Sequence, residues 1–167
     1  LKTLAQVMDH STEHATFVAG CLCPPQEGER LSKVGIRVQD QAKMVLARLG
    51  QQGAKAFADL YLPSPEFKVR KWALRQLVAG FDLSTVRPAM SAHADDIACF
   101  LDPAFCGEAK MIEQALLALK ETRLAAVPHM DSIANHISSR HMHIAVAALR
   151  ALTACGKAAV VHGGAVA

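Results

Sequence analysis

Four stretches of the sequence share one spacing, in which a large apolar residue, an alanine and a leucine follow at intervals of four residues. Residues four apart lie on the same face of an α-helix. A small residue between two large ones lets the backbones of packed helices approach along that ridge. The pattern therefore predicts four equivalent helices. Their core residues are Val38, Ala42 and Leu46; Val69, Ala73 and Leu77; Met111, Ala115 and Leu119; Ile144, Ala148 and Leu152.

A second motif recurs behind two of these helices. Ala126-Val127-Pro128-His129 is matched by Ala159-Val160-Val161-His162, and the third residue of each copy follows the alanine of its helix by 13 residues. Because the motif and its 13-residue distance from the preceding helix both recur, the sequence indicates a duplicated helical hairpin. Such hairpins cannot bury their apolar stripe alone, so they stack into solenoids that present an extended surface.

The whole chain has helical periodicity, and no stretch alternates as a half-buried strand would. Its composition, 51% hydrophobic but only 5% aromatic, favours close-packed helices over a sheet. We therefore expect an all-α fold. The expected helices cover residues 2–20, 29–49, 54–62, 65–79, 85–101, 107–120, 127–139 and 140–154, with a further element from Val160 onward.

Helix start and stop signals support these boundaries. Gly50 and Gly156 follow the last periodic residues of two helices, where a left-handed residue commonly ends a helix. Ser64 and Pro65 predict a capping hydroxyl followed by a proline at the first helical position. We expect a break in the 85–101 helix near His93.

The four large–alanine–leucine sets given above are called the ladders below. The helices that contain them resemble the first helix of HEAT-like repeats, the armadillo-type α-solenoids. The best matches are residues 69–77 and 144–152, and the resemblance covers about residues 31–167. It implies a right-handed superhelix of four to five antiparallel helix pairs in one solenoid segment. The units would be 31–65, 66–107, 108–140 and an incomplete 141–167, with 1–30 as a divergent first unit. The Asp that often precedes the first helix in this family is absent here. No polar capping unit is visible, so we expect a segment of a longer protein.

Charge and cysteine content restrict the class of protein. The formal net charge is only +3, which does not by itself indicate nucleic acid as a partner. Five cysteines form an odd count without a disulfide framework, which favours reduced thiols inside the cell, in the cytoplasm or else in an organelle. No apolar run approaches the ~20 residues that cross a bilayer, and the start shows no signal-peptide pattern.

Histidines form the richest cluster of titratable residues. His136, His141 and His143, with His129 nearby, have imidazoles that transition metals accept as ligands. However, no carboxylate or cysteine stands at ligand spacing among them, and His129 has a counterpart at His162 that indicates a structural role. We therefore predict no metal site. His10 with His14, Cys21 with Cys23, and Cys99 with Cys106 are weaker candidates.

The densest basic stretch is a possible interaction face. It consists of Lys68, Arg70, Lys71 and Arg75, with Lys43, Arg48 and Lys55 in the preceding unit. On a curved solenoid these side chains would bind an acidic peptide or a phosphate backbone. The alternative is an ordinary solvated helix face, because no aromatic residues are interleaved for base stacking.

No catalytic residues or cofactor are expected. The sequence contains no phosphate-binding glycine motif, nucleophile elbow or paired carboxylates. The leading hypothesis is a non-catalytic scaffold or subunit of a larger assembly. It would bind other proteins through its second helices, 54–62, 85–101, 127–139 and from Val160 onward. A nucleic-acid or ribonucleoprotein-associated solenoid that uses residues 68–75 is the alternative. A HEAT-like lyase or a chaperone for a cofactor is the third.

Overall fold

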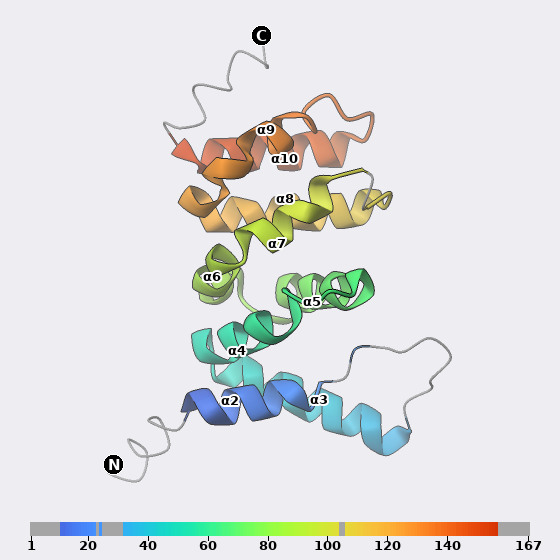
Figure 1. Ribbon diagram of the computed structural model, residues 1–167, viewed down its shortest axis with the longest axis vertical. Helices are drawn as coiled ribbons and strands as arrows, with labels where there is room; N and C mark the ends of the chain where they lie inside the picture. Colours follow the sequence, from blue (N-terminus) through green and yellow to red (C-terminus); the bar gives the residue numbers. More distant parts are fainter. Residues whose placement is uncertain (1–10, 23, 25–31, 104–105, 157–167) are drawn as a thin grey trace. The chain divides into compact units, whose positions relative to one another are not determined.

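The computed structural model describes residues 11–22, 24, 32–103 and 106–156, and this part of the chain contains helices and turns but no strand. The prediction of an all-α protein is confirmed. The chain divides into two compact units, Leu1–Ala89 and Met90–Ala167, and each is described by itself (Figure 1). The expected element from Val160 onward, the second copy of the hairpin motif, and residues 2–10 of the first expected helix lie outside the described residues.

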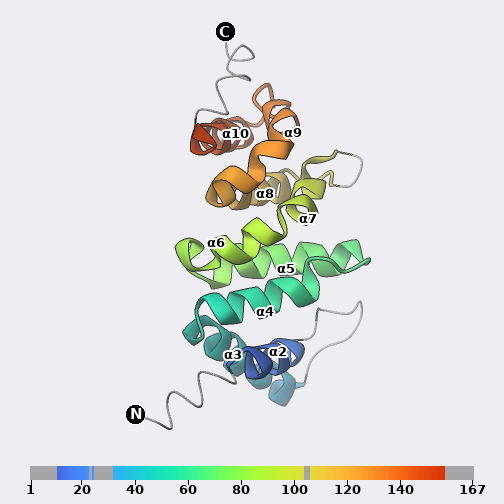
Figure 2. The same cartoon turned by 60° about the vertical axis from the view of Figure 1, so that its left-hand side comes forward.

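In its described residues, the first unit contains four helices and most of a fifth (Figures 1 and 2). They are α2 (Ser11–Gly20), α3 (Lys33–Arg48), α4 (Gln51–Tyr61), α5 (Phe67–Gly80) and α6 (Leu83–Ala92). α4 packs against α2, α3 and α5, and α2 also packs against α3. The helix that contributes most to this core is therefore α4, whose buried face lies between its three neighbours.

Two glycines permit the tight hairpin between α3 and α4. Gly50 joins the helices with a φ of 57° and a ψ of −125°, a backbone conformation that residues other than glycine rarely adopt. Gly53 lies so close to α3 that an added Cβ would be 2.1 Å from the carbonyl oxygen of Leu46. The backbones of α3 and α4 thus meet at a position that only glycine fits.

Aromatic side chains hold α4 against α5. The ring centroid of Phe57 lies 5.0 Å from that of Tyr61 and 5.3 Å from that of Trp72, and Tyr61 meets Trp72 edge-on at 5.1 Å. The Tyr61 hydroxyl also shares its one hydrogen between the carbonyls of Ala19, at 3.0 Å, and Leu22. Because the last carbonyls of a helix have no partner within it, Tyr61 satisfies the end of α2 and fixes α2 to α4.

The second unit is centred on α8 (Figures 1 and 2). Its elements are α7 (Ala94–Ala98), the 3₁₀ turn η1 (Cys99–Leu101), α8 (Ala109–Thr122), the 3₁₀ segment η2 (Arg123–His129), α9 (Met130–Ala134) and α10 (Met142–Ala154). α8 packs against α7, η1, η2 and, most extensively, α10, while α9 covers part of α10.

The alanines and leucines of the four ladders are all buried. They are Ala42, Ala73, Ala115 and Ala148, and Leu46, Leu77, Leu119 and Leu152. Among the large residues that precede them, Met111 and Ile144 are buried and Val69 is half-buried. Burial of the alanine between two larger residues is the arrangement that ridge packing requires.

The expected core position of Val38 is wrong, since 48% of this residue is exposed. α3 is 16 residues long, whereas its described neighbours α2 and α4 have 10 and 11 residues. The N-terminal turns of α3 therefore extend past the described helices that cover Ala42 and Leu46.

One expected helix start with its cap, and one expected continuous helix, also differ from the structure. α5 begins at Phe67 with Glu66 at the N-cap, and the Ser64 hydroxyl accepts a hydrogen bond from the Glu66 amide at 3.3 Å instead of capping the helix. The helix expected over 127–139 is replaced by the end of η2, by α9 and by turns after Ala134. Pro128 lies inside η2, where its missing N–H and its ring disfavour a continuous α-helix. The break predicted at His93 is confirmed, because α6 ends at Ala92 and α7 begins at Ala94.

Candidate functional site

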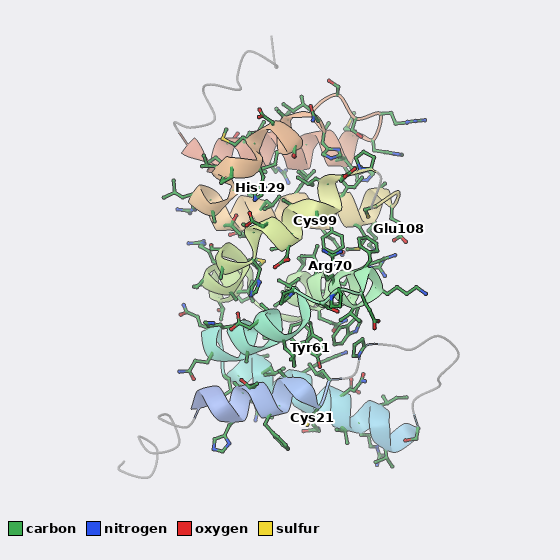
Figure 3. The ribbon with its side chains drawn as sticks, in the orientation of Figure 1. Cys21, Tyr61, Arg70, Cys99, Glu108 and His129 are labelled. Atoms are coloured by element: carbon green, nitrogen blue, oxygen red, sulfur yellow. The ribbon has the colours of Figure 1, made fainter. Side chains whose placement is uncertain are left out.

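The basic residues of α5 do not form one face. Lys68, Lys71 and Arg75 are spaced by three and four residues and share one side of the helix, and Arg70 lies on another side. The Arg70 guanidinium carbon is 5.8 Å above the ring centre of Phe67, and its Nε is buried without a hydrogen-bond partner. Figure 3 labels Arg70 on this helix. Arg70 is therefore partly engaged by its own helix.

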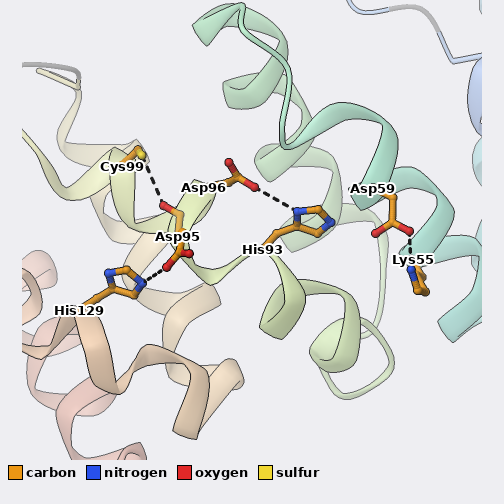
Figure 4. Close-up of polar contacts among 7 residues, drawn as sticks. All are labelled: Lys55, Asp59, His93, Asp95, Asp96, Cys99 and His129. Atoms are coloured by element: carbon orange, nitrogen blue, oxygen red, sulfur yellow. Dashed lines mark hydrogen bonds and ion pairs between the residues drawn. The ribbon is translucent and has the colours of Figure 1, made fainter.

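The other basic residues that the sequence grouped with α5 are dispersed. Arg48 and Lys55 are exposed on α3 and α4, and Lys43 is half-buried. Lys55 forms an ion pair with Asp59 one turn further along α4 (Figure 4). The charge of Lys55 is thus balanced locally and adds little to a field directed at a partner.

The four clustered histidines do not meet at one site. His129 Nε2 is 2.9 Å from Asp95 Oδ1 (Figure 4), and His136 Nε2 is 2.9 Å from the carbonyl oxygen of Leu101. His141 and His143 are exposed, with ring centroids 5.6 Å apart. Within the described residues no group of three or more His, Cys, Asp and Glu side chains is placed to hold a metal ion.

A set of polar contacts fixes the short helix α7. His93, at its N-cap, places Nδ1 3.1 Å from Asp96 Oδ2, and Cys99 Sγ donates to the Asp95 carbonyl at 3.4 Å (Figure 4). The Asp95 carboxylate also pairs with His129, which belongs to η2. Residue spacing did not reveal this last pair because its members are 34 positions apart.

A polar pocket of about 410 Å³ opens between η1 and α9. Its polar lining includes Asp102, Ser132, Asn135 and His136. Nε2 of His136 faces the Leu101 carbonyl, so this nitrogen is a donor and does not accept a proton from a nucleophile. The pocket therefore offers hydrogen-bonding side chains from α9 and from the residues that follow η1 and α9.

One side of α10 is an exposed apolar stripe, formed by Met142, Val146 and Leu149 and called the α10 stripe below. These residues are 80%, 38% and 37% exposed, and their spacing of four and three places them on one helix face. Beside it runs a shallow groove of about 380 Å³. The groove is lined by Lys120, Val146, Leu149, Arg150, Thr153 and Ala154.

The described cysteines differ in accessibility. Cys99 is exposed and Cys21 is partly exposed, whereas Cys106 and Cys155 are buried. Burial raises the pKa of the Cys155 thiol, and its Sγ donates a hydrogen bond to the Arg123 carbonyl at 3.4 Å. Cys23 and His10 lie outside the described residues.

Comparison with family models, curated proteins and solved structures gives no match to this chain. The resemblance to HEAT-like repeats therefore rests on the ladder residues and on the Ala126-Val127-Pro128-His129 motif that follows one of them. None of the described helices combines the length and the apolar character that crossing a bilayer requires.

Proposed function

We propose that this chain is a non-catalytic protein-binding scaffold, or a structural subunit of a larger assembly, whose helix pairs stack as a HEAT-like solenoid. The eight buried alanines and leucines of the ladders support this arrangement, since each lies in a helix that packs against a neighbour. A stack of such units has an extended side for binding rather than one enclosed pocket.

The observation that carries the proposal is the distribution of exposed apolar side chains. Eleven large apolar residues are exposed in the described part of the chain, and eight of them lie on α3 and α10. The five on α3 are Val34, Ile36, Val38, Met44 and Val45. Scattered exposed apolar residues are ordinary, but clustered ones mark interaction surfaces. Concentration on two helices favours binding to other proteins.

Nucleic-acid association is the second candidate, and the composition of α5 favours it. This helix contains Lys68, Arg70, Lys71 and Arg75 and no acidic residue. Phosphate contacts by such residues release counterions, so affinity falls steeply with salt.

Affinity capture of the full chain from its native source, after nuclease treatment and at two salt concentrations, distinguishes the candidates. The scaffold proposal predicts a partner protein that is retained at high salt, is identified by mass spectrometry and binds again when purified. The double variant Arg70→Glu, Lys71→Glu should retain this partner.

RNA binding that weakens steeply with salt and is lost in the double variant would instead establish the nucleic-acid alternative. Failure of every purified candidate to bind would refute the scaffold proposal.

A further inference from the structure

The outer side of α10 is apolar from Met142 to Leu149, while the opposite side is buried. Ile144, Ala148 and Leu152 are buried against the rest of the second unit. Met142 and Val146 face away from that core with Leu149, and the groove follows them. An exposed stripe at helical spacing beside a shallow groove suits a second helix laid along it, because helix-in-groove recognition uses anchors with this period.

Basic groups surround the C-terminal half of this groove. Lys120 and Arg150 are among its lining residues. The one acidic group paired at this rim is Glu121, whose Oε1 is 2.8 Å from Lys120 Nζ. Because Glu121 balances the charge of Lys120, Arg150 leaves this rim with a net positive charge, which is complementary to acidic side chains.

We propose that the α10 stripe binds an amphipathic helix of a partner protein whose apolar face is flanked by carboxylates. This inference rests on the proposed function and specifies its partner. The apolar residues of the partner enter the groove beside Val146 and Leu149, and its carboxylates pair with Arg150 and Lys120. The apolar contact supplies most of the affinity, and the charged rim selects the partner and its orientation.

Charge argues against occupants from this chain itself. α10 contains Arg150 and no acidic residue, so two copies joined through α10 would gain no ion pair there. α3 of a second copy carries four basic residues and only Asp40 as an acid. Residues 157–167 contain Lys157 and no carboxylate side chain. Each would bring further positive charge to a positive rim.

The test uses the full chain and three labelled peptides of 13 residues, the length of α10. One peptide has an apolar helical stripe flanked by Glu, the second has the same stripe flanked by Lys, and the third is a scrambled Glu peptide. Fluorescence anisotropy measures each affinity at low and high salt. The Glu peptide should bind about tenfold more tightly than the Lys peptide, and salt should reduce the difference. Equal binding of the Glu and Lys peptides, or of the Glu and scrambled peptides, would overturn the proposal.

Two variants and a matched control localise the binding. Val146→Asp should abolish binding of the Glu peptide, and Arg150→Glu should reverse the preference toward the Lys peptide. Val45→Asp is the control, because Val45 is 40% exposed on α3 and Val146 is 38% exposed on α10. It should leave the affinity unchanged. A Val45→Asp variant that loses binding as fully as Val146→Asp would overturn the assignment to α10.

A photoreactive residue in place of Met142 then identifies the occupant by mass spectrometry. The proposal requires crosslinks to the Glu peptide. The proposal would be overturned if the crosslinks formed instead with a second copy of the chain, or with residues 157–167 of the same chain. If no peptide binds but a purified protein partner is still retained at high salt, this inference fails and the proposed scaffold function stands.

Discussion

Replacement of Gly53 by alanine sets helix propensity against packing in the first unit. Alanine is better than glycine within a helix by roughly 1 kcal/mol, so propensity alone predicts a more stable protein. The structure predicts the opposite, because the new Cβ would be 2.1 Å from the Leu46 carbonyl oxygen and 2.8 Å from its carbon. Since real Cβ atoms essentially never come closer than 3.0 Å, the two backbones would have to separate by about 0.9 Å, the difference between 3.0 and 2.1 Å.

That separation disturbs the seam that buries Leu46 and Ala54. Overpacking of a core typically costs about 1–3 kcal/mol, and sometimes more. After the gain in propensity we expect Gly53→Ala to lower the free energy of unfolding by up to roughly 2 kcal/mol. The melting temperature should fall by about 2–4 °C for each kcal/mol in a chain of this size.

Thermal and urea unfolding followed by circular dichroism provide the measurement. Gly80→Ala is the matched control, since Gly80 is also in a helix of the first unit and nothing lies within 4 Å of its added Cβ. The control should be neutral or slightly stabilising. If Gly53→Ala is as stable as Gly80→Ala, the close approach of α3 and α4 is wrong.

Three further predictions concern other contacts. Ala115→Leu should lower the free energy of unfolding by about 1–3 kcal/mol by overpacking α8, whereas the same change at exposed Ala47 should have little effect; equal melting curves would show that Ala115 does not face a helix. Tyr61→Phe should cost about 1–2 kcal/mol in urea unfolding, because it leaves the Leu22 carbonyl without its donor while the Ala19 carbonyl still accepts from the Leu22 amide, and an unchanged midpoint would contradict the bond to Leu22. Because burial raises the pKa of Cys155 and disfavours its thiolate, mass spectrometry should find exposed Cys99 alkylated first at about pH 8, and simultaneous alkylation would show that Cys155 is accessible.

The sequence predicted the helices well where a local signal defines them. The ladder spacing identified buried alanines and leucines in α3, α5, α8 and α10, because burial on one helix face imposes that period. Gly50 and Gly156 were predicted as helix stops, and both have a positive φ. Where the environment of a residue depends on neighbouring helices, the sequence was insufficient. Val38 has the ladder spacing, yet it is exposed because α3 is longer than the described helices beside it.

The candidate site was less predictable for the same reason. The spacing within α10 allowed two apolar faces, and only the packing of α8 and α9 determines which one remains exposed. The proximity of His129 to Asp95 and of Gly53 to Leu46 depends on how separate helices meet. The motif around Gly53 contains no signal that distinguishes a close approach from an ordinary helix start. By contrast, the separation of Arg70 from Lys68 and Lys71 follows from helical periodicity and was accessible from the sequence.

The most direct test of the account is a methyl NMR spectrum of the full chain, recorded during titration with the Glu-flanked peptide. We predict that the methyl signals of Met142, Val146 and Leu149 shift together and reach saturation, while those of Val34 and Val45 on α3 stay in place. Shifts confined to α3, or no shift at any residue of the α10 stripe while the peptide binds, would contradict the central claim that this stripe is the docking surface.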